Sequence, residues 1–345
     1  MNLNDKLQLA YSKIKSARRV LLVSHVSPDA DALASLGAMI EFLQTESIEY
    51  VAYAERKLVG AYNFIPQATE VSSSAPNDLL VFDVILILDC GSKARTGLAP
   101  RINVLLEIPA AGRITKRPYL IEFDHHPAQD HYADLEIRLP EKASTTEIIY
   151  QFLTVNNWPI TKTMASSILI GLMTDTGHFL HANSSREAIA VSSEMLMRGA
   201  SLPKIIESTV HNKSFSSLKV WGRVLENMIF NSETGLAASA LTAAELDELL
   251  PSTEIRLDND LFGDIVSFIS TLQGIKVALL LREEGDMVKG SLRTVADEVD
   301  LIKIASLFGG GGHKKAAGFS VPGRLAKTAT GWKIIENKQS WIIRR

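Results

Sequence analysis

The sequence contains little cysteine, no long apolar run and no excess of either charge. Cys90 is the one cysteine among 345 residues, so an internal disulfide is excluded and a reducing compartment such as the cytoplasm is favoured. The N-terminal segment MNLNDKLQLA lacks the apolar stretch of a secretory signal. No apolar run approaches the ~20 residues that a membrane span requires. We therefore expect a cytoplasmic protein that does not cross a membrane.

The charge balance limits the class of partner. The 36 Lys and Arg residues against 39 Asp and Glu residues leave a net charge of −3. This balance argues against binding along long double-stranded nucleic acid and leaves room for a local phosphate pocket. The hydrophobic fraction of 46% is that of an ordinary globular protein, and the chain length favours two domains.

The first half of the chain has the pattern of an α/β domain. Short, nearly continuous apolar runs predict parallel strands that are covered on both faces, and the segments between them predict crossover helices. We expect a mostly parallel sheet flanked by helices, with an irregular insertion over residues 98–118. The predicted strands cover residues 20–24, 84–91 and 118–126, and the predicted helices cover residues 30–44, 160–177 and 186–199.

The second half predicts a smaller domain of mixed α/β type. Apolar or alternating segments such as GIKVALLLRE and DMVKGSLRTV indicate strands, and AAELDELL and VDLIKIASLF indicate helices between them. The stretch before them mixes proline, lysine, asparagine and serine, which is typical of a connection. We therefore expect a first domain over residues 1–202, a linker over 203–218 and a second domain over 219–345.

Acidic residues and histidines follow the predicted strands of the first half. The segment HVSPDAD places His25, Asp29 and Asp31 directly after the first strand, and Asp89 and Asp124 end the next two. The carboxyl ends of neighbouring parallel strands open into one crevice, so these side chains should meet. Several carboxylates in one place require cations. The donor set favours two divalent ions, Mn²⁺ or Mg²⁺ before Zn²⁺, and phosphoester hydrolysis is the usual task of such a site.

Five segments, in order, carry a family resemblance: HVSPDAD, LDCGS, FDHH, MTDTG and GGGGHKKAAG. With them the chain resembles the DHH phosphoesterases that have a DHHA1 domain, and within these the bacterial branch of bifunctional oligoribonucleases and pAp phosphatases. The resemblance implies an N-terminal DHH domain, a C-terminal DHHA1 domain and an active site in the cleft between them. It also implies hydrolysis by water that two metal ions activate, with Mn²⁺ expected first and Mg²⁺ as the alternative.

The resemblance assigns roles residue by residue. Asp89 bridges the two ions, His126 faces the substrate phosphate, and Asp124 orients a histidine from behind the metals. The catalytic pair is therefore His126 and Asp124. The expected ligands of one ion are His25, Asp29 and Asp89, and those of the other are Asp31, Asp89, His125 and Asp175.

The glycine-rich segment predicts a phosphate site in the second domain. Four glycines allow a tight turn whose amides point at an anion, and the resemblance adds a histidine and an arginine to it. The expected substrate-binding residues are Arg293, Gly310, Gly311, Gly312 and His313. His178 and His181 follow MTDTG, and for them contact with phosphate and a structural role both stay open.

The predicted substrates are short RNA oligonucleotides and 3′-phosphoadenosine 5′-phosphate (pAp). A linear or cyclic dinucleotide of the c-di-AMP type is the alternative, because it also needs one anchored and one attacked phosphate. A single-strand exonuclease is less favoured, since no added nucleic-acid module is evident. A non-catalytic nucleotide sensor is less favoured because every expected metal ligand is present. Dimers are common in the family, which favours a homodimer.

Overall fold

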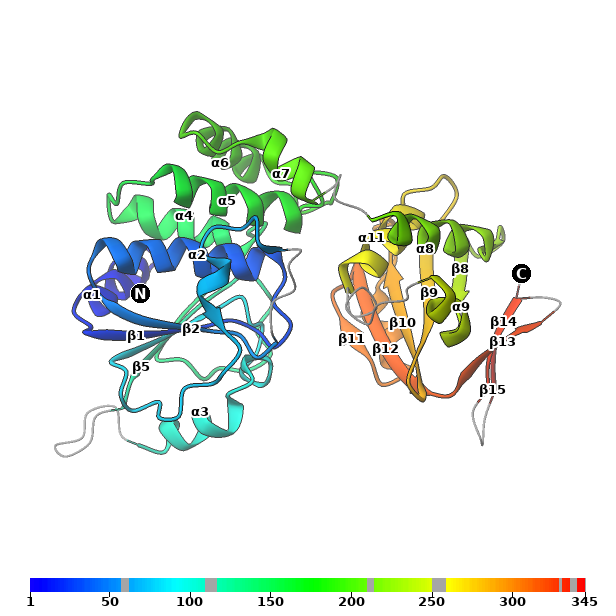
Figure 1. Ribbon diagram of the computed structural model, residues 1–345, viewed down its shortest axis with the longest axis horizontal. Helices are drawn as coiled ribbons and strands as arrows, with labels where there is room; N and C mark the ends of the chain where they lie inside the picture. The colour runs from blue at the N-terminus through cyan, green and yellow to red at the C-terminus, as the bar shows by residue number, and fades with distance from the viewer. Residues whose placement is uncertain are drawn as a thin grey trace. The chain divides into compact units, whose positions relative to one another are not determined.

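The chain folds into two compact units (Figure 1). The computed structural model describes residues 1–56, 62–108, 117–209, 214–249, 259–328, 331–335 and 340–344. The first unit comprises Met1–His211 and the second Asn212–Arg345.

The first unit is built on a parallel sheet, as the apolar runs predict. Its strand order is β3-β2-β1-β4-β5-β6, and every pairing between neighbours is parallel. The three predicted strands lie at its centre, and the sequence did not indicate the flanking ones. The strands are β1 (Arg19–Val23), β2 (Glu49–Tyr53), β3 (Val71–Ser72), β4 (Val84–Leu88), β5 (Tyr119–Asp124) and β6 (Leu135–Arg138).

Helices cover both faces of this sheet (Figure 1). Leu22 and Leu86 pack into a core with α1, α2, α4 and α5, while Leu21 and Ile85 pack against α3 on the opposite face. This alternation is why the strand sequences are almost continuously apolar. The helices are α1 (Leu3–Lys15), α2 (Ala30–Thr45), α3 (Ala99–Leu106), α4 (Thr145–Val155), α5 (Lys162–Asp175), α6 (Arg186–Met197) and α7 (Leu202–Thr209).

Two segments without a clear sequence pattern contain helices. Residues 98–118, expected as an irregular insertion, include α3, whose buried Ile102 and Leu105 anchor it to the sheet; residues 109–116 lie outside the described part. The segment 203–218, expected as a linker, contains most of α7 and the start of α8 (Phe215–Glu226), with residues 210–213 outside the described part. Ile205 anchors α7 in the core of the first unit.

The second unit contains a mixed sheet, which confirms the predicted α/β class. Its strand order is β11-β12-β10-β9-β8-β7, with β8 and β9 parallel and the other pairs antiparallel. The strands are β7 (Ile229–Asn231), β8 (Leu236–Leu241), β9 (Val277–Glu284), β10 (Met287–Arg293), β11 (Gly311–Gly312) and β12 (Ala316–Pro322).

Helices cover this sheet too, and the chain ends in a second, smaller sheet. The helices are α8, α9 (Ala243–Leu249), α11 (Asn259–Ser270) and α12 (Leu301–Ser306). The C-terminal antiparallel strands are β13 (Arg324–Thr328), β14 (Gly331–Ile335) and β15 (Ser340–Arg344). Among the helices that the structure describes, none is both long and apolar enough to cross a bilayer.

Candidate active site

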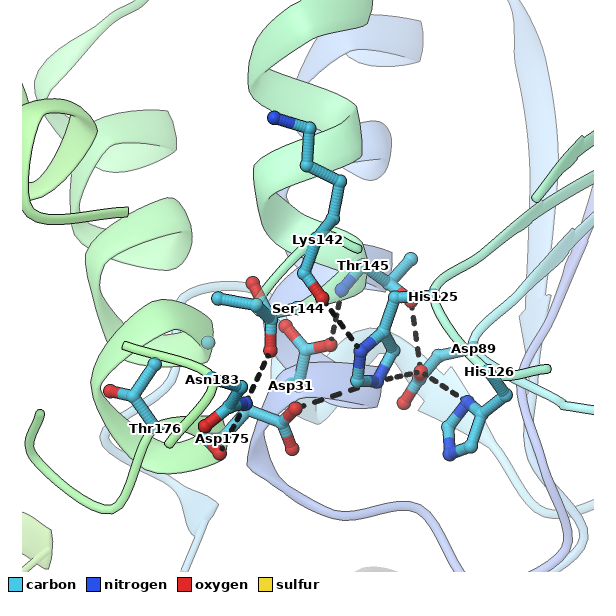
Figure 2. A network of polar contacts seen from close by, with 12 residues as sticks. Asp31, Asp89, His125, His126, Lys142, Ser144, Thr145, Asp175, Thr176 and Asn183 are labelled. Carbon is cyan, nitrogen blue, oxygen red and sulfur yellow. Dashed lines mark hydrogen bonds and ion pairs between the residues drawn. The ribbon is translucent and has the colours of Figure 1, made fainter. Parts of the chain in front are cut away.

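The predicted acids and histidines of the first unit gather at the carboxyl ends of β1, β4 and β5. His25 follows β1, and Asp29 caps the N-terminus of α2 by accepting a hydrogen bond from the Ala32 amide at 3.0 Å. Asp89 follows β4, and Asp124 ends β5. Parallel strands bring these positions to one edge of the sheet, as the sequence predicts. Figure 2 shows the part of this cluster around Asp89, His125, His126 and Asp175.

Asp89 lies at the centre of the cluster. Its carboxylate oxygens lie 3.5 Å from His125 Nε2, 3.5 Å from His126 Nδ1 and 3.9 Å from His25 Nε2. The residue is 1% exposed, and its φ of +60° is one that residues other than glycine rarely adopt. Such a backbone conformation persists only where the surroundings hold it in place.

Asp175 approaches from the end of α5. Its Oδ2 lies 3.4 Å from His125 Nε2, and the other ring nitrogen of His125 lies 3.4 Å from the Lys142 carbonyl oxygen. A backbone carbonyl behind an imidazole fixes the tautomer that leaves Nε2 facing the acids, which is a common arrangement behind metal-binding histidines. Asn183 Nδ2 donates to the Asp175 carbonyl oxygen at 3.2 Å.

Asp124 holds His126 and the loop after β4. Its Oδ1 accepts from the His126 amide at 2.7 Å and lies 2.9 Å from His126 Nδ1, while its Oδ2 accepts from the Gly91 amide. Burial opposes ionisation of Asp124, but these hydrogen bonds outweigh it and lower the pKa of Asp124. A charged, fully buried Asp124 therefore orients His126.

The N-terminus of α4 completes the cluster, although the sequence did not indicate that this helix contributes to the site. The Thr145 amide donates to Asp31 Oδ2 at 2.7 Å, and the Thr146 amide and hydroxyl donate to Asp31 Oδ1 at 3.2 and 2.9 Å. The Thr145 hydroxyl donates to Asp89 Oδ1 at 2.8 Å. The signature Ser-Thr-Thr-Glu marks a helix start, but only the fold shows which carboxylates lie there.

Gly171 on α5 makes room for this arrangement. A Cβ at Gly171 would lie 2.2 Å from Asp31 Oδ1 and 2.3 Å from Thr146 Oγ1. The helix pair α2 and α5 therefore approaches closely because one residue has no side chain.

The cluster carries more negative charge than its protein partners neutralise. Burial, and then the charges of Asp31 and Asp29, raise the pKa of Asp89 well above its usual range. Burial also raises the pKa of Asp175, to about 8, against the opposing effect of His125. Carboxyl groups with such pKa values at the end of parallel strands mark a site that lacks positive charge.

The donor atoms fit divalent metal ions. Two groups of three residues have ligand atoms within 4.8 Å of one another: Asp89, His125 and His126, and His25, Asp29 and Asp89. Both ring nitrogens of His25 are buried without a hydrogen-bond partner among the described residues. Buried imidazole nitrogens are normally satisfied, and metal ligation would satisfy one of them. The two groups share Asp89, the residue expected to bridge.

The predicted phosphate loop of the second unit is a β-hairpin. Gly311 and Gly312 form β11 and pair with Gly318 and Ala317 of β12, and the His313 amide donates to the Ala316 carbonyl oxygen at 2.7 Å. A Cβ at Gly310 would lie 2.1 Å from the Gly318 carbonyl oxygen, and one at Gly312 2.5 Å from the Ala316 carbonyl oxygen. Close strand pairing thus requires these two glycines, whatever else the loop binds.

The other predicted residues of that region lie nearby in the same unit. Arg293 ends β10, its Nη1 donates to the Leu292 carbonyl oxygen at 3.0 Å, and burial lowers the pKa of its guanidinium. Lys315 donates to the Ala296 carbonyl oxygen at 2.6 Å and pairs with Asp297 at 2.8 Å. Phosphate binding by Arg293, His313 and the glycines stays a prediction.

His178 has a contact within the first unit. Its Nε2 lies 2.9 Å from the Thr209 hydroxyl of α7, and His181 packs over Gly177, where a Cβ would lie 2.4 Å from His181 Nε2. These contacts favour the structural interpretation of both histidines.

Comparison with known proteins identifies both units. The model described as DHH family, N-terminal domain, matches residues 19–172, and the DHHA1 domain model matches residues 241–335. The bifunctional oligoribonuclease and PAP phosphatase NrnA of Thermus thermophilus is 28% identical over 92% of this chain and 89% of its own length. The NrnA of Bacillus subtilis is 23% identical over 88% of this chain and 89% of its own length. The crystal structure of an exopolyphosphatase-related protein from Bacteroides fragilis is 26% identical and superposes with a TM-score of 0.79 over 91% of this chain and 90% of that one. The chain therefore belongs to the DHH/DHHA1 family of divalent-metal-dependent phosphoesterases.

Proposed function

We propose that the protein hydrolyses short oligoribonucleotides and the 3′-phosphate of pAp. The observation that carries the proposal is the Asp89 cluster, in which buried carboxylates and imidazoles face one another without enough protein cations. The NrnA relatives, whose names give these two substrates, match almost the whole chain. Both substrates place two phosphates near each other, and one of them must be held while the other is attacked.

The proposed metal centre takes two divalent ions, with Mn²⁺ preferred. His25, Asp29 and Asp89 would hold one ion, and Asp31, Asp89, His125 and Asp175 the other. The shared position of Asp89 between two donor groups supports this count. Bound there, the ions would supply an activated water and neutralise the charge on the phosphoryl group.

The protein's own groups position the substrate. His126, fixed by Asp124, is placed to contact the attacked phosphoryl group, because its ring lies beside Asp89. Arg293, Gly310, Gly311, Gly312 and His313 would hold a second phosphate. In this assignment the first unit carries the metals and the second unit binds substrate, in a homodimer.

The test is a substrate panel with purified protein and Mn²⁺. Release of phosphate or nucleotide is measured from pAp, the linear dinucleotide pApA, cyclic di-AMP and a longer single strand. We expect turnover of pAp and pApA, none of it in Asp89→Asn, and an unchanged rate in Glu187→Gln, which alters an exposed carboxylate on α6. Preference for the cyclic or long substrate would replace the proposed substrates, and tight nucleotide binding without turnover would exclude catalysis.

A further inference from the structure

An arginine, Arg95, lies beside the Asp89 cluster, in the segment that follows β4. Arg95 belongs to the short helix η3 (Lys93–Thr96). Its backbone is fixed at both sides: its amide donates to the Ser92 carbonyl oxygen at 3.2 Å, and its carbonyl accepts from the Val26 amide at 2.8 Å. Arg95 therefore ties the loop after β4 to the loop that carries His25.

The guanidinium of Arg95 packs over Gly91 next to His126. From the point where a Cβ of Gly91 would lie, Arg95 Nη1 is 3.2 Å away and His126 Cγ is 3.5 Å away. The positive φ of +70° at Gly91 turns the chain there. The absence of a side chain at Gly91 thus lets a guanidinium and an imidazole share one patch of backbone beside the metal cluster.

No ion pair and no side-chain hydrogen bond engages this guanidinium within the described part of the chain. Arg95 is nevertheless half-buried. Asp124 is occupied by His126 and Gly91, and Asp89 by Thr145. The neighbouring Arg138, by contrast, forms an ion pair with the buried carboxylate of Glu122 at 2.6 Å. A guanidinium whose N–H donors have no partner in the protein is able to bind the oxygens of an anion such as phosphate.

We propose that Arg95 binds a non-bridging oxygen of the phosphoryl group under attack. The inference rests on the proposed function for the identity of the anion, and on the position of Arg95 beside His126 for the phosphate concerned. Guanidinium groups match phosphate oxygens in a planar, two-pronged geometry that an ammonium group does not reproduce. Because Arg95 belongs to the same unit as the metal ligands, its contribution is independent of substrate length, unlike that expected of Arg293.

The experiment compares Arg95→Ala and Arg95→Lys with Arg101→Ala. Arg101 lies on α3 in the same part of the chain, is also half-buried, and does not contact Gly91. We expect Arg95→Ala to lower kcat/KM about a hundredfold for pAp and pApA alike, and Arg95→Lys to recover little of it. Arg101→Ala should stay within about twofold of wild type. Added guanidinium should restore part of the activity of Arg95→Ala.

Binding of inorganic phosphate and of Mn²⁺, measured by calorimetry, separates this role from a structural one. Phosphate binding to the Mn²⁺-loaded protein should weaken at least about tenfold in Arg95→Ala, while Mn²⁺ affinity changes by less than about twofold. Unchanged phosphate binding, or a parallel loss of Mn²⁺ binding, would overturn the inference. If the wild-type protein turns over no substrate but loses phosphate binding on Arg95→Ala, the proposed function fails while Arg95 is still shown to bind phosphate.

Discussion

The metal cluster of the first unit and the glycine-rich hairpin of the second both attract attention in the sequence, but the structure accounts for them differently. In the hairpin, Gly310 and Gly312 are required by the backbone of β12, and Lys315 has partners in its own unit. In the cluster, both ring nitrogens of His25 lack a hydrogen-bond partner among the described residues, and burial raises the pKa of Asp89. A sequence motif that strand pairing already explains gives weak support for a bound ligand. Buried polar groups that have no partner in the protein give strong support for one.

The largest effect should come from the centre of the cluster. Asp89→Asn keeps the shape of the side chain and removes the charge that both donor groups share. We expect kcat/KM to fall at least about a thousandfold with Mn²⁺, because a bridging carboxylate serves both ions. Steady-state kinetics with pAp measure this. A loss below about tenfold would show that Asp89 is no shared ligand.

The hairpin offers a matched pair of glycines. Gly310→Ala should destabilise the second unit by about 3 kcal/mol, because its Cβ would meet the Gly318 carbonyl oxygen, which is backbone and does not yield easily. Gly311→Ala meets nothing within 4 Å and should cost little stability. Urea denaturation of both variants checks this difference.

The same two variants also test the hypothesis that the hairpin binds a substrate phosphate. If Gly311→Ala retains stability but loses substrate affinity, the exposed β11 backbone contacts substrate. If its KM is that of wild type, Gly311 has no part in binding, and the contrast between the two units becomes sharper.

The pH dependence of the metal-free protein should reveal the cluster directly. Asp89 and Asp175 have pKa values raised above the value of about 3.9 for an unfolded aspartate. Above that pH the folded state holds more protons than the unfolded chain, so the free energy of unfolding falls as the pH rises toward 8, by up to about 1.4 kcal/mol per pH unit for each proton.

Denaturation midpoints in a chelator, taken from about pH 5 to about pH 8, measure this slope. Asp89→Asn should flatten it, since it removes one of the acids whose pKa is raised, and added Mn²⁺ should reverse it by binding the ionised carboxylates. A metal-free protein that becomes more stable as the pH rises through this range would contradict the assigned shifts.

The sequence predicted those elements whose residue pattern is typical of only one kind of structure. Continuous apolar runs predicted β1, β4 and β5 because a strand buried on both faces needs them. The parallel order then predicted that His25, Asp89 and Asp124 would meet. Strand β3, with only two residues and partial exposure, has no such signal. Helix α3 was also missed, because it has only eight residues and only two of them, Ile102 and Leu105, are buried apolar positions.

Contacts between distant segments were beyond the sequence. Thr145 lies 56 residues from Asp89 and 114 from Asp31, and nothing in Ser-Thr-Thr-Glu indicates which carboxylates its helix will meet. The glycine run had two meanings, a phosphate turn or close strand pairing. The register of Gly311 with Gly318 shows the strand pairing, and phosphate binding by the glycines stays a prediction.

The smallest predicted effect concerns Thr145, which donates hydrogen bonds to two of the expected metal ligands, Asp31 and Asp89. Thr145→Val removes the hydroxyl that donates to Asp89 Oδ1 at 2.8 Å but keeps the amide that donates to Asp31. The loss of one hydrogen bond to a charged group, about 1.5 kcal/mol, should weaken Mn²⁺ binding about tenfold. Thr145→Ser should restore it. Thr154→Val is the control, because the Thr154 hydroxyl donates at 2.8 Å to Tyr150 within the same helix. Equal Mn²⁺ affinity in Thr145→Val and Thr154→Val would mean that the fold of α4, and not this hydroxyl, positions the central carboxylate.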